Sequence, residues 1–216
     1  MTKNPGNVEK LIRVSSDIPR KTVYRLSLYL RCLGLMVARR ESIVSSAALA
    51  SVAGVQPAQL RRDLAYCGPL GKRGTGYEVV TLRNRLEEIL GRASLQPVIL
   101  VGVGNLGQAL LSYKGFAREG FEIVAAFDLK PQKQLEGRMG VRGMGSMKGL
   151  VQRREIRMAI LCVPGSSAQS VAEQLCEVGI QAILNFSPVV LHLPETVAVN
   201  NVNLAIELEN LSYFAR

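Results

Sequence analysis

The sequence lacks several features that would assign it to a broad class of protein. Its longest apolar runs, such as 97–101 and 182–184, are far too short to span a bilayer. Residues 1–20 contain no apolar segment of the kind that directs export. The four cysteines have no C-x-x-C spacing and the chain has one histidine, which argues against a metal site or a disulfide framework. We therefore expect a soluble protein of the reducing cytoplasm that holds no metal.

Charge is distributed unevenly along the 216 residues. Residues 1–92 contain 16 Lys and Arg against 7 Asp and Glu, whereas residues 93–216 contain 11 against 10. Almost all of the net charge of +10 therefore lies in the first part of the chain. A basic segment of this kind favours nucleic acid as the partner, and an ordinary solvated basic surface is the alternative.

The basic part has the pattern of a helix-turn-helix. A first helix is predicted with Asp17 as its N-cap, because apolar residues recur at helical spacing over 23–37. A second helix is predicted over 46–53, ending at Gly54, and a third over 57–66. A helix, a glycine-containing turn and a second helix form the geometry that places the second helix in the DNA major groove.

The third predicted helix has a face suited to reading bases. Leu60 and Leu64 share one face by their spacing and are expected to be buried. Gln and Arg side chains make bidentate contacts to base edges, so Gln59 and Arg62 on the opposite face are candidate readers. Tyr66 projects from the same face as Gln59 and Arg62, and Arg61 flanks that face. A solvated helix face is the alternative.

A glycine-rich loop follows the third predicted helix. Residues 68–77 carry Lys72 and Arg73, and the strand-like run 77–80 comes next. A recognition helix followed by a hairpin with a basic tip is a winged helix, whose tip can contact phosphate or enter a minor groove. A solvated loop is the alternative. A further amphipathic helix is predicted over 82–91.

The second half opens with the pattern of a dinucleotide-binding turn. An apolar run over 98–101 is typical of a buried parallel strand, and a helical pattern over 106–117 follows it. Between them stands a G-x-G-x-x-G sequence, Gly102-Val103-Gly104-Asn105-Leu106-Gly107. Gly102 allows the tight turn, Gly104 lets the backbone approach pyrophosphate, and Gly107 permits close packing of the helix. The helix N-terminus then offers amide groups to the phosphates.

An acidic residue after the next strand indicates which cofactor binds. A strand over 121–127 is predicted to end at Asp128, 21 residues after Gly107, where a carboxylate accepts hydrogen bonds from a ribose. A carboxylate there repels the 2′-phosphate of NADP(H), so NAD(H) is expected, and Lys130 weakens this preference without reversing it. A CoA-binding module of similar strand order is disfavoured by Asp128.

The alternation of strands and helices continues after this point. Strands are predicted over 157–163 and 180–184, with a helix over 166–178 between them. Loops at the carboxyl ends of such strands face the ligand crevice. The residues expected at the nicotinamide end are therefore Val163, Pro164, Asn185, Phe186, Ser187 and Pro188. Ordinary loop chemistry is the alternative.

No catalytic constellation accompanies the predicted cofactor site. A dehydrogenase uses a proton donor beside the nicotinamide, yet the one histidine, His192, lies beyond the crevice loop. The nucleotide fold uses residues 98–200, which leaves no substrate domain. We therefore expect that the protein is not an enzyme and that it binds its cofactor without catalysing a reaction on it. The alternative is a small NAD-dependent oxidoreductase with an incidental basic segment.

Together these motifs resemble the Rex family of redox-sensing transcriptional repressors over essentially the whole chain. The stretches that carry the resemblance are 45–46, 60–66, Gly68, 71–77, 102–107, 127–128, 163–164 and 183–186. The resemblance implies an α/β fold in which an N-terminal winged helix-turn-helix domain precedes a Rossmann-like NAD(H)-binding domain with an exchanged C-terminal helix. It also implies a homodimer that binds an inverted-repeat operator in double-stranded DNA and is released when NADH displaces NAD⁺.

The resemblance extends to domain boundaries and to the DNA contacts at the second helix. With the charge and strand patterns it predicts a DNA-binding domain at 1–93, an NAD(H)-binding domain at 94–200 and a dimerisation helix at 201–216. It adds Ser45 and Ser46 to the DNA-binding residues. The final helix carries an apolar stripe that must be covered by its own sheet or by a partner, at Leu204, Leu208, Leu211 and Phe214.

Three residues are expected to take part in the switch. Tyr113 lies with Phe186 near the expected nicotinamide position, where the state of that ring could be sensed. Asn203 opens the final predicted helix where the family commonly has an Asp that pairs with an arginine matching Arg25. An Asn can cap a helix and hydrogen-bond, but it cannot form an ion pair. A second departure is Cys67, which stands where the family often has an aromatic residue.

Overall fold

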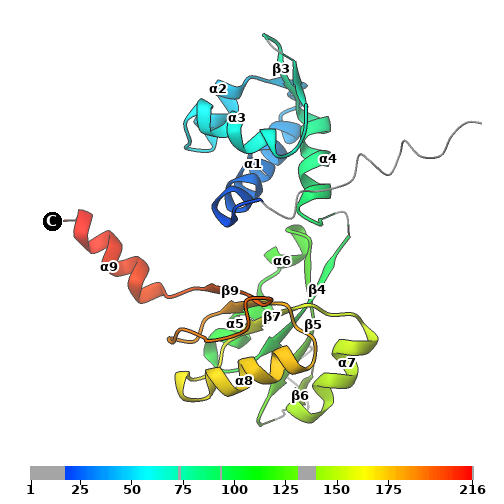
Figure 1. The fold of residues 1–216 in the computed structure, drawn as a ribbon, viewed down its shortest axis with the longest axis vertical. Helices are drawn as coiled ribbons and strands as arrows, with labels where there is room; N and C mark the ends of the chain where they lie inside the picture. The colour runs from blue at the N-terminus through cyan, green and yellow to red at the C-terminus, as the bar shows by residue number, and fades with distance from the viewer. Residues whose placement is uncertain (1–17, 73, 93, 131–139, 216) are drawn as a thin grey trace, which may run out of the picture. The chain divides into compact units, whose positions relative to one another are not determined.

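The computed structural model describes residues 18–72, 74–92, 94–130 and 140–215, and Asp17, the predicted first N-cap, lies outside them. The chain divides into two compact units with the boundary between Ser94 and Leu95, and Figure 1 shows the elements of each. Within the described residues no helix has both the length and the apolar character to cross a membrane.

The first unit is a small helical domain with a short antiparallel sheet. Its order is β1-β3-β2. Its elements are α1 (Arg20–Ala38), β1 (Ile43–Val44), α2 (Ser46–Val52), α3 (Pro57–Ala65), β2 (Gly71–Lys72), β3 (Gly76–Glu78) and α4 (Val79–Ile89). The three helices predicted for the helix-turn-helix are therefore present, followed by the hairpin of a wing.

The core of the first unit is formed by α1, α2, α3 and α4. Leu60 and Leu64 of α3 are buried, as their spacing predicts. The strand predicted over 77–80 is wrong in its second half, because Val79 begins α4 and is fully buried. Val79, Leu82 and Leu86 recur at helical spacing and together bury the inner face of α4.

The second unit is a six-stranded parallel sheet with helices between the strands. Its elements are β4 (Gln96–Val101), α5 (Asn105–Ser112), α6 (Gly115–Arg118), β5 (Phe121–Asp128), β6 (Val141–Gly143), the 3₁₀ helix η3 (Met144–Ser146), α7 (Met147–Arg153), β7 (Met158–Leu161), α8 (Gly165–Glu177), β8 (Ala182–Asn185), β9 (Ala198–Asn201) and α9 (Leu204–Phe214). The order is β6-β5-β4-β7-β8-β9. This is the doubly wound order of dinucleotide-binding folds, with the reversal between β4 and β7.

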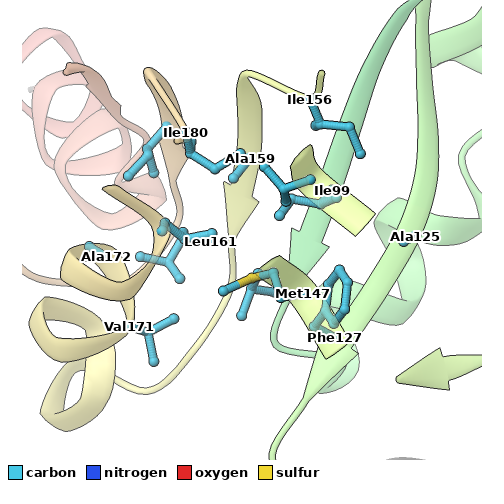
Figure 2. Packing of buried hydrophobic residues seen from close by; sticks show 14 of the residues in the cluster. Ile99, Ala125, Phe127, Met147, Ile156, Ala159, Leu161, Val171, Ala172 and Ile180 are labelled. Carbon is cyan, nitrogen blue, oxygen red and sulfur yellow. The ribbon is translucent and has the colours of Figure 1, made fainter. Parts of the chain in front are cut away.

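Both faces of this sheet are buried. Ile99 and Val101 of β4 belong to the larger cluster, which also contains residues of α7 and α8 (Figure 2). Val98 and Leu100 point to the opposite face, where leucines of α5 pack. Residues on both sides of β4 are apolar for this reason, and the run 98–101 shows no alternation between polar and apolar positions.

One predicted helix of the second unit is divided in two. The pattern over 106–117 suggests a single helix, but α5 ends at Ser112 and α6 begins at Gly115. The backbone of Tyr113 is extended, with ψ near 105°, which breaks the helical path. The break leaves the Tyr113 side chain on the surface, 59 % exposed.

Candidate cofactor and DNA-binding sites

The predicted cofactor residues lie along one edge of the parallel sheet. Val101 pairs with Phe127 on β5 and with Leu161 on β7, and Leu161 pairs with Asn185 on β8. These four residues form a row across the sheet at the carboxyl ends of its central strands. The sequence motifs that follow the row therefore come together at the point where the strand order reverses, which is the ligand crevice of doubly wound folds.

The three glycines of the turn have different structural reasons to be glycine. Gly102 has φ of +94°, and a Cβ there would lie 2.5 Å from the carbonyl oxygen of Cys162. A Cβ on Gly107 would overlap the carbonyl of Gly102. Gly104 has an ordinary φ of −72°, and a Cβ there would meet no atom within 4 Å. The fold thus requires glycine at 102 and 107, whereas at 104 it leaves open space.

This open space lies at the N-terminus of α5. Gly104 is the N-cap of α5, and no side chain caps the helix. The amide groups of a first helical turn have no partners within the helix, and the helix dipole favours negative charge there. Asn105 and Leu106 are exposed beside Gly104. A glycine that the fold itself does not need, next to an uncapped helix start, fits a bound phosphate group.

Asp128 ties the turn to the end of β5. Its carboxylate accepts hydrogen bonds from the backbone amide of Val103, at 2.8 Å, and from that of Lys130, at 3.0 Å. Each bond goes to a different carboxylate oxygen, so each oxygen keeps capacity to accept another donor. The half-buried carboxylate can therefore accept ribose hydroxyls without losing its hold on the turn. Lys130 is exposed next to it.

The loop after β8 is held by its own polar side chains. Asn185 is fully buried, and its amide nitrogen donates to the carbonyl of Val189 and to the side chain of Asn201. Its side-chain oxygen accepts the backbone amide of Ser187, whose hydroxyl donates to the carbonyl of Val163. Asn185 and Ser187 thus fix the crevice loops to each other. Exposed groups at this edge come from Pro164 and Pro188 instead.

Aromatic side chains lie on the face of the sheet to which Val98 and Leu100 point. Tyr113 makes an edge-to-face contact with Phe116, with ring centroids 5.1 Å apart. The Tyr113 ring lies over Gly115, where a Cβ would overlap it. Phe116 and Phe186 both pack against the smaller sheet cluster. The glycine at 115 thus leaves room for this placement of the tyrosine.

The exposed face of α3 carries the residues predicted to contact DNA. Arg61 and Arg62 are exposed and Tyr66, just after the helix, is 45 % exposed. Arg61 donates to the hydroxyl of Ser46 at 3.2 Å, which joins α3 to the start of α2. The Ser45 hydroxyl caps α2 by accepting the amide of Ala48. Both serines lie next to a cationic side chain or a helix start, where a DNA phosphate could be held.

A groove of about 520 Å³ separates this face from the wing. Ser46, Arg61 and Lys72 contribute polar groups to its lining, together with the wing glycines and the ring of Tyr77. Lys72 is exposed on β2. Arg73, the second predicted wing cation, lies outside the described residues. Hydroxyl and cationic groups of α2, α3 and the wing thus line one groove.

A buried carboxylate inside the first unit was not predicted as part of any site. Asp63 of α3 is 1 % exposed and accepts hydrogen bonds from four side chains. Arg25 binds both of its oxygens, through Nε at 2.6 Å and Nη2 at 2.7 Å. The other donors are the hydroxyls of Thr22 and Tyr29, and the amide of Gln59. The cluster joins α1 to the recognition helix.

These hydrogen bonds keep the buried carboxylate ionised. Burial alone would raise the pKa of Asp63, but the hydrogen bonds from Arg25, Tyr29 and Gln59 outweigh it and hold the pKa below its ordinary value. Burial and the bond to Asp63 raise the pKa of the Tyr29 hydroxyl. A carboxylate that only accepts is thus surrounded by groups that can donate to it.

The signal for this cluster was present in the sequence. Asp63 lies three residues after Leu60 and one before Leu64, on the face that the spacing predicts to be buried. A buried acid requires a cation, and Arg25 is on the helix that covers this face. Gln59, predicted to point outward, is half-buried and bonded to Asp63. The helical position of Gln59 was predicted, but its partner was not.

The three predicted switch residues make the following contacts. Arg25 binds Asp63, and its Nη1 forms no hydrogen bond with any described residue. Asn203 is the N-cap of α9, where its side-chain oxygen accepts the amides of Ala205 and Ile206. The capping role of Asn203 is therefore confirmed. Arg25 lies in the first unit, while Tyr113 and Asn203 lie in the second.

In the described part of the chain there is no cluster of metal-ligating side chains, and two of the cysteine thiols are held protonated. No group of His, Cys, Asp and Glu among residues 18–72, 74–92, 94–130 and 140–215 is arranged to hold a metal ion. Burial raises the pKa of both Cys67 and Cys162 to about 11. Both thiols are therefore protonated at neutral pH, which makes them poor nucleophiles.

Comparisons with known proteins match both halves of the chain. Residues 94–189 match the family described as "CoA binding domain", and residues 17–65 match "Putative DNA-binding protein N-terminus". Two solved structures of RSP, a Rex-family repressor, are also similar. The complex with β-NAD⁺ and operator DNA is 34 % identical, with a TM-score of 0.85 and coverage of 92 % of both chains. The complex with β-NADH is 33 % identical, with a TM-score of 0.81, and covers 93 % of this chain and 95 % of that one.

Curated relatives match nearly the whole length of the chain. The redox-sensing transcriptional repressor Rex of Syntrophobacter fumaroxidans is 41 % identical, covering 92 % of this chain and 96 % of its own. Rex of Lactobacillus gasseri is 43 % identical, and the match covers 91 % of this chain and 93 % of that protein. Rex of Streptomyces coelicolor is 41 % identical, and the match covers 96 % of this chain and 81 % of that protein. These relatives are named repressors and not enzymes, which supports the expectation of a protein without catalytic activity. The chain belongs to the Rex family of redox-sensing transcriptional repressors.

Proposed function

We propose that this chain is a cytoplasmic repressor that binds operator DNA and is released when NADH binds, so that transcription follows the ratio of NADH to NAD⁺. The proposal assigns DNA binding to the basic winged helix and cofactor binding to the dinucleotide turn of the same chain. It is supported by the similarity to RSP, a relative whose structures contain NAD⁺ with operator DNA and, separately, NADH.

The open position at Gly104 is the observation that carries the cofactor half of the proposal. The fold has no need of glycine there, yet a side chain would occupy the space before the first turn of α5. A pyrophosphate bound at this point receives amide hydrogen bonds, and Asp128 accepts the ribose hydroxyls. When bound, the cofactor would supply a nicotinamide ring, and the oxidation state of that ring distinguishes NAD⁺ from NADH. Tyr113, Pro164 and Phe186 are proposed to border that ring.

The DNA half of the proposal rests on α3 and the wing. Arg62 is exposed on α3 and can reach a guanine edge, while Arg61, Ser46 and Lys72 line the groove and can hold backbone phosphates. The proposed interface also includes Ser45, Tyr66 and Arg73. Base contacts would then determine which DNA sequence is bound, and phosphate contacts would determine the position of the domain on the duplex.

A homodimer is part of the same proposal. Inverted-repeat operators match the two-fold symmetry of a dimer, which doubles the contact with DNA. The helix α9 is proposed to be exchanged between the two subunits, because none of its residues is buried within its own chain. Two copies of α9 would then bury each other's apolar stripe or insert it into the partner.

A titration with DNA and cofactor tests the proposal. Binding of the chain to a library of palindromic duplexes is measured by gel shift with no cofactor, with NAD⁺ and with NADH. We expect a retained subset of sequences that NADH releases and NAD⁺ does not. Retention of no sequence, or equal binding in all three conditions, would contradict the proposal.

Calorimetry and an activity assay separate the alternative functions. NADH is expected to bind, and CoA is expected not to, although the matching family is described as a CoA binding domain. Gly104→Val is the control, since a side chain there blocks phosphate from either ligand. Hydride transfer to or from a 2-hydroxy acid or an aldehyde would favour an oxidoreductase instead.

A further inference from the structure

The bond between Asp63 and Gln59 connects a buried charge to the recognition surface. The Gln59 amide nitrogen donates to Asp63 Oδ1 at 2.9 Å, one helical turn away on α3. Asp63 is 1 % exposed, whereas Gln59 is half-buried at the edge of the exposed face. The two residues therefore lie one turn apart on the same side of the recognition helix, with Asp63 in the core and Gln59 nearer the surface.

The chemistry of the carboxylate fixes which way the Gln59 amide faces. An ionised carboxylate only accepts hydrogen bonds, so the NH₂ group of Gln59 must point at Asp63 and its oxygen must point away. The opposite orientation would set the amide oxygen against a carboxylate oxygen. Arg25 and Tyr29 hold the carboxylate in place and ionised. The amide of Gln59 is thus preset before any partner arrives.

The preset amide keeps free hydrogen-bonding capacity on its outer side. One N–H of Gln59 is used by Asp63, which leaves the second N–H and the carbonyl oxygen. In the described part of the chain, no buried side-chain nitrogen or oxygen lacks a hydrogen-bond partner. The Gln59 oxygen has no partner there, so it must be open to solvent. The surface of α3 therefore presents one donor and one acceptor in a fixed order.

We infer that Asp63 is a positioning residue that makes Gln59 specific for adenine in the major groove. Adenine offers N7 as an acceptor and its N6 amino group as a donor, which is the complement of the pattern that Gln59 presents. An amide free to turn over would lose part of this preference, because the reversed order matches the N4 amino group and the O6 acceptor of a C·G pair instead. The inference rests on the proposed function and assigns the readout of one A·T pair to this pair of residues.

A base-by-base binding experiment tests the inference. Each position of the retained operator half-site is substituted in turn, and the affinity of four proteins is measured: wild type, Gln59→Met, Asp63→Asn and the double variant. At one A·T position the wild type is expected to discriminate by about 5- to 150-fold, as one good bidentate contact does. Gln59→Met should lose this discrimination there and keep it at the other positions.

The double variant separates positioning from simple structural support. Asp63→Asn should reduce base discrimination at the same A·T position that Gln59→Met affects. The double variant should show the same loss of discrimination as Gln59→Met alone, because Asp63 acts only through Gln59. Gln152→Met, an exposed glutamine in the second unit, is the matched control and should change nothing. A uniform loss of affinity in Asp63→Asn across all operator variants would overturn the positioning role.

A second variant covers the case in which Asp63→Asn does not fold. Replacing both charges together, as Arg25→Gln with Asp63→Asn, leaves no unpaired buried charge and should be tolerated better. Its specificity profile is expected to match that of Asp63→Asn. If the wild type binds an operator while Gln59→Met keeps every preference, the inference fails alone. If the wild type binds no operator, the proposed function fails and the inference with it.

Discussion

The three glycines of the dinucleotide turn differ in whether the fold itself requires them. The fold requires glycine at 102 and 107, because a Cβ at either position would meet backbone carbonyl atoms. It does not require glycine at 104, where the φ is ordinary and the space beyond is open. Because Gly104 also stands at the uncapped start of α5, a bound phosphate group gives a reason for glycine there that packing does not.

Substitution at Gly104 is expected to remove the cofactor without harming the fold. Gly104→Val should leave the thermal unfolding midpoint within a few degrees of wild type, whereas Gly107→Val should lower it sharply by forcing α5 away from the turn. Calorimetry should show no NADH binding by Gly104→Val, and gel shifts should show operator binding that NADH no longer reverses. Full response to NADH in this variant would mean that the phosphate lies elsewhere.

The Asp63 cluster should make stability depend on acid. The folded-state pKa of Asp63 lies below its ordinary value of 3.8, so the unfolded chain takes up the proton first as pH falls. The stabilisation is therefore complete above about pH 4 to 5 and is lost as the pH falls through the lowered pKa. We expect the urea midpoints of wild type and Asp63→Asn to differ by a constant amount above about pH 5, and the difference to shrink as the pH falls below 3.8. A difference that stays constant as the pH falls below 3.8 would contradict the ionised cluster.

Polar residues with structural roles are hard to find from sequence. Asn185 and Ser187 were predicted at the crevice, where they lie, but their side chains hold the loops after β7 and β8 together. Asp63 was not assigned a role at all. Hydrogen-bond partners such as Arg25 and Asp63 are 38 residues apart in the chain, and only the packing of α1 on α3 brings them together. Spacing can predict a face of a helix, but it cannot predict what covers that face.

At the scale of elements, long segments with strong patterns were predicted and short ones were missed. The helices of the first unit and the strands β4 and β5 follow the periodicity of their apolar residues. The strands β1 and β6 have two and three residues, which is too short for a pattern to be visible. The strand β9 is as long as β7 and β8, but half of its residues are asparagines, so it lacks an apolar run. The helix α7 and the break between α5 and α6 were also missed. These features depend on pairing with neighbouring strands and on one extended residue, Tyr113.

The wing depends on one glycine for its attachment to the rest of the domain. Gly76 starts β3 with φ of +101°, and a Cβ there would overlap the carbonyl of Val44 on β1. β3 is the central strand of the small sheet, paired with both β1 and β2. A side chain at position 76 would therefore push β3 away from β1, and β2 with Lys72 would move with it.

Two glycine variants of the wing test this attachment. Gly74 also has a positive φ, +82°, but a Cβ there would meet nothing within 4 Å. Both substitutions to alanine carry the backbone strain, so the difference between them isolates the collision with β1. We expect Gly76→Ala to be less stable than Gly74→Ala and to bind operator more weakly. Equal unfolding midpoints and equal affinities would show that β3 can shift freely.

For the whole molecule, the central question is how a cofactor in one unit affects DNA bound by the other. A ligand shifts a conformational equilibrium only through different affinity for the two states. By linkage, operator DNA must then weaken NADH binding by the same factor by which NADH weakens DNA binding. The coupling needs a physical connection that both units share, and α9 is the element left unexplained by either core.

The helix α9 has an apolar surface that its own chain does not cover. Leu204, Leu208 and Leu211 are each more than 60 % exposed, and Phe214 is 81 % exposed. A helix of 11 residues is marginal in water without packing against another surface. Figure 1 shows α9, in red, clear of the sheet that precedes it in the chain. Its folded state therefore calls for another surface to cover it, and the proposed exchange between two copies of the chain would supply that surface.

Removal of α9 should accordingly separate cofactor binding from DNA binding. A chain that ends at residue 202 keeps the sheet, the Gly104 turn and Asp128, so calorimetry should still detect NADH. Light scattering should show a monomer or a loose dimer, because the stripe that joins the subunits is gone. Operator affinity should fall with it, since one winged helix then binds where two bound together. A truncated chain that remains a tight dimer, binds its operator and releases it with NADH would show that α9 is not the connection. The coupling would then have to pass through the surfaces of the two units themselves.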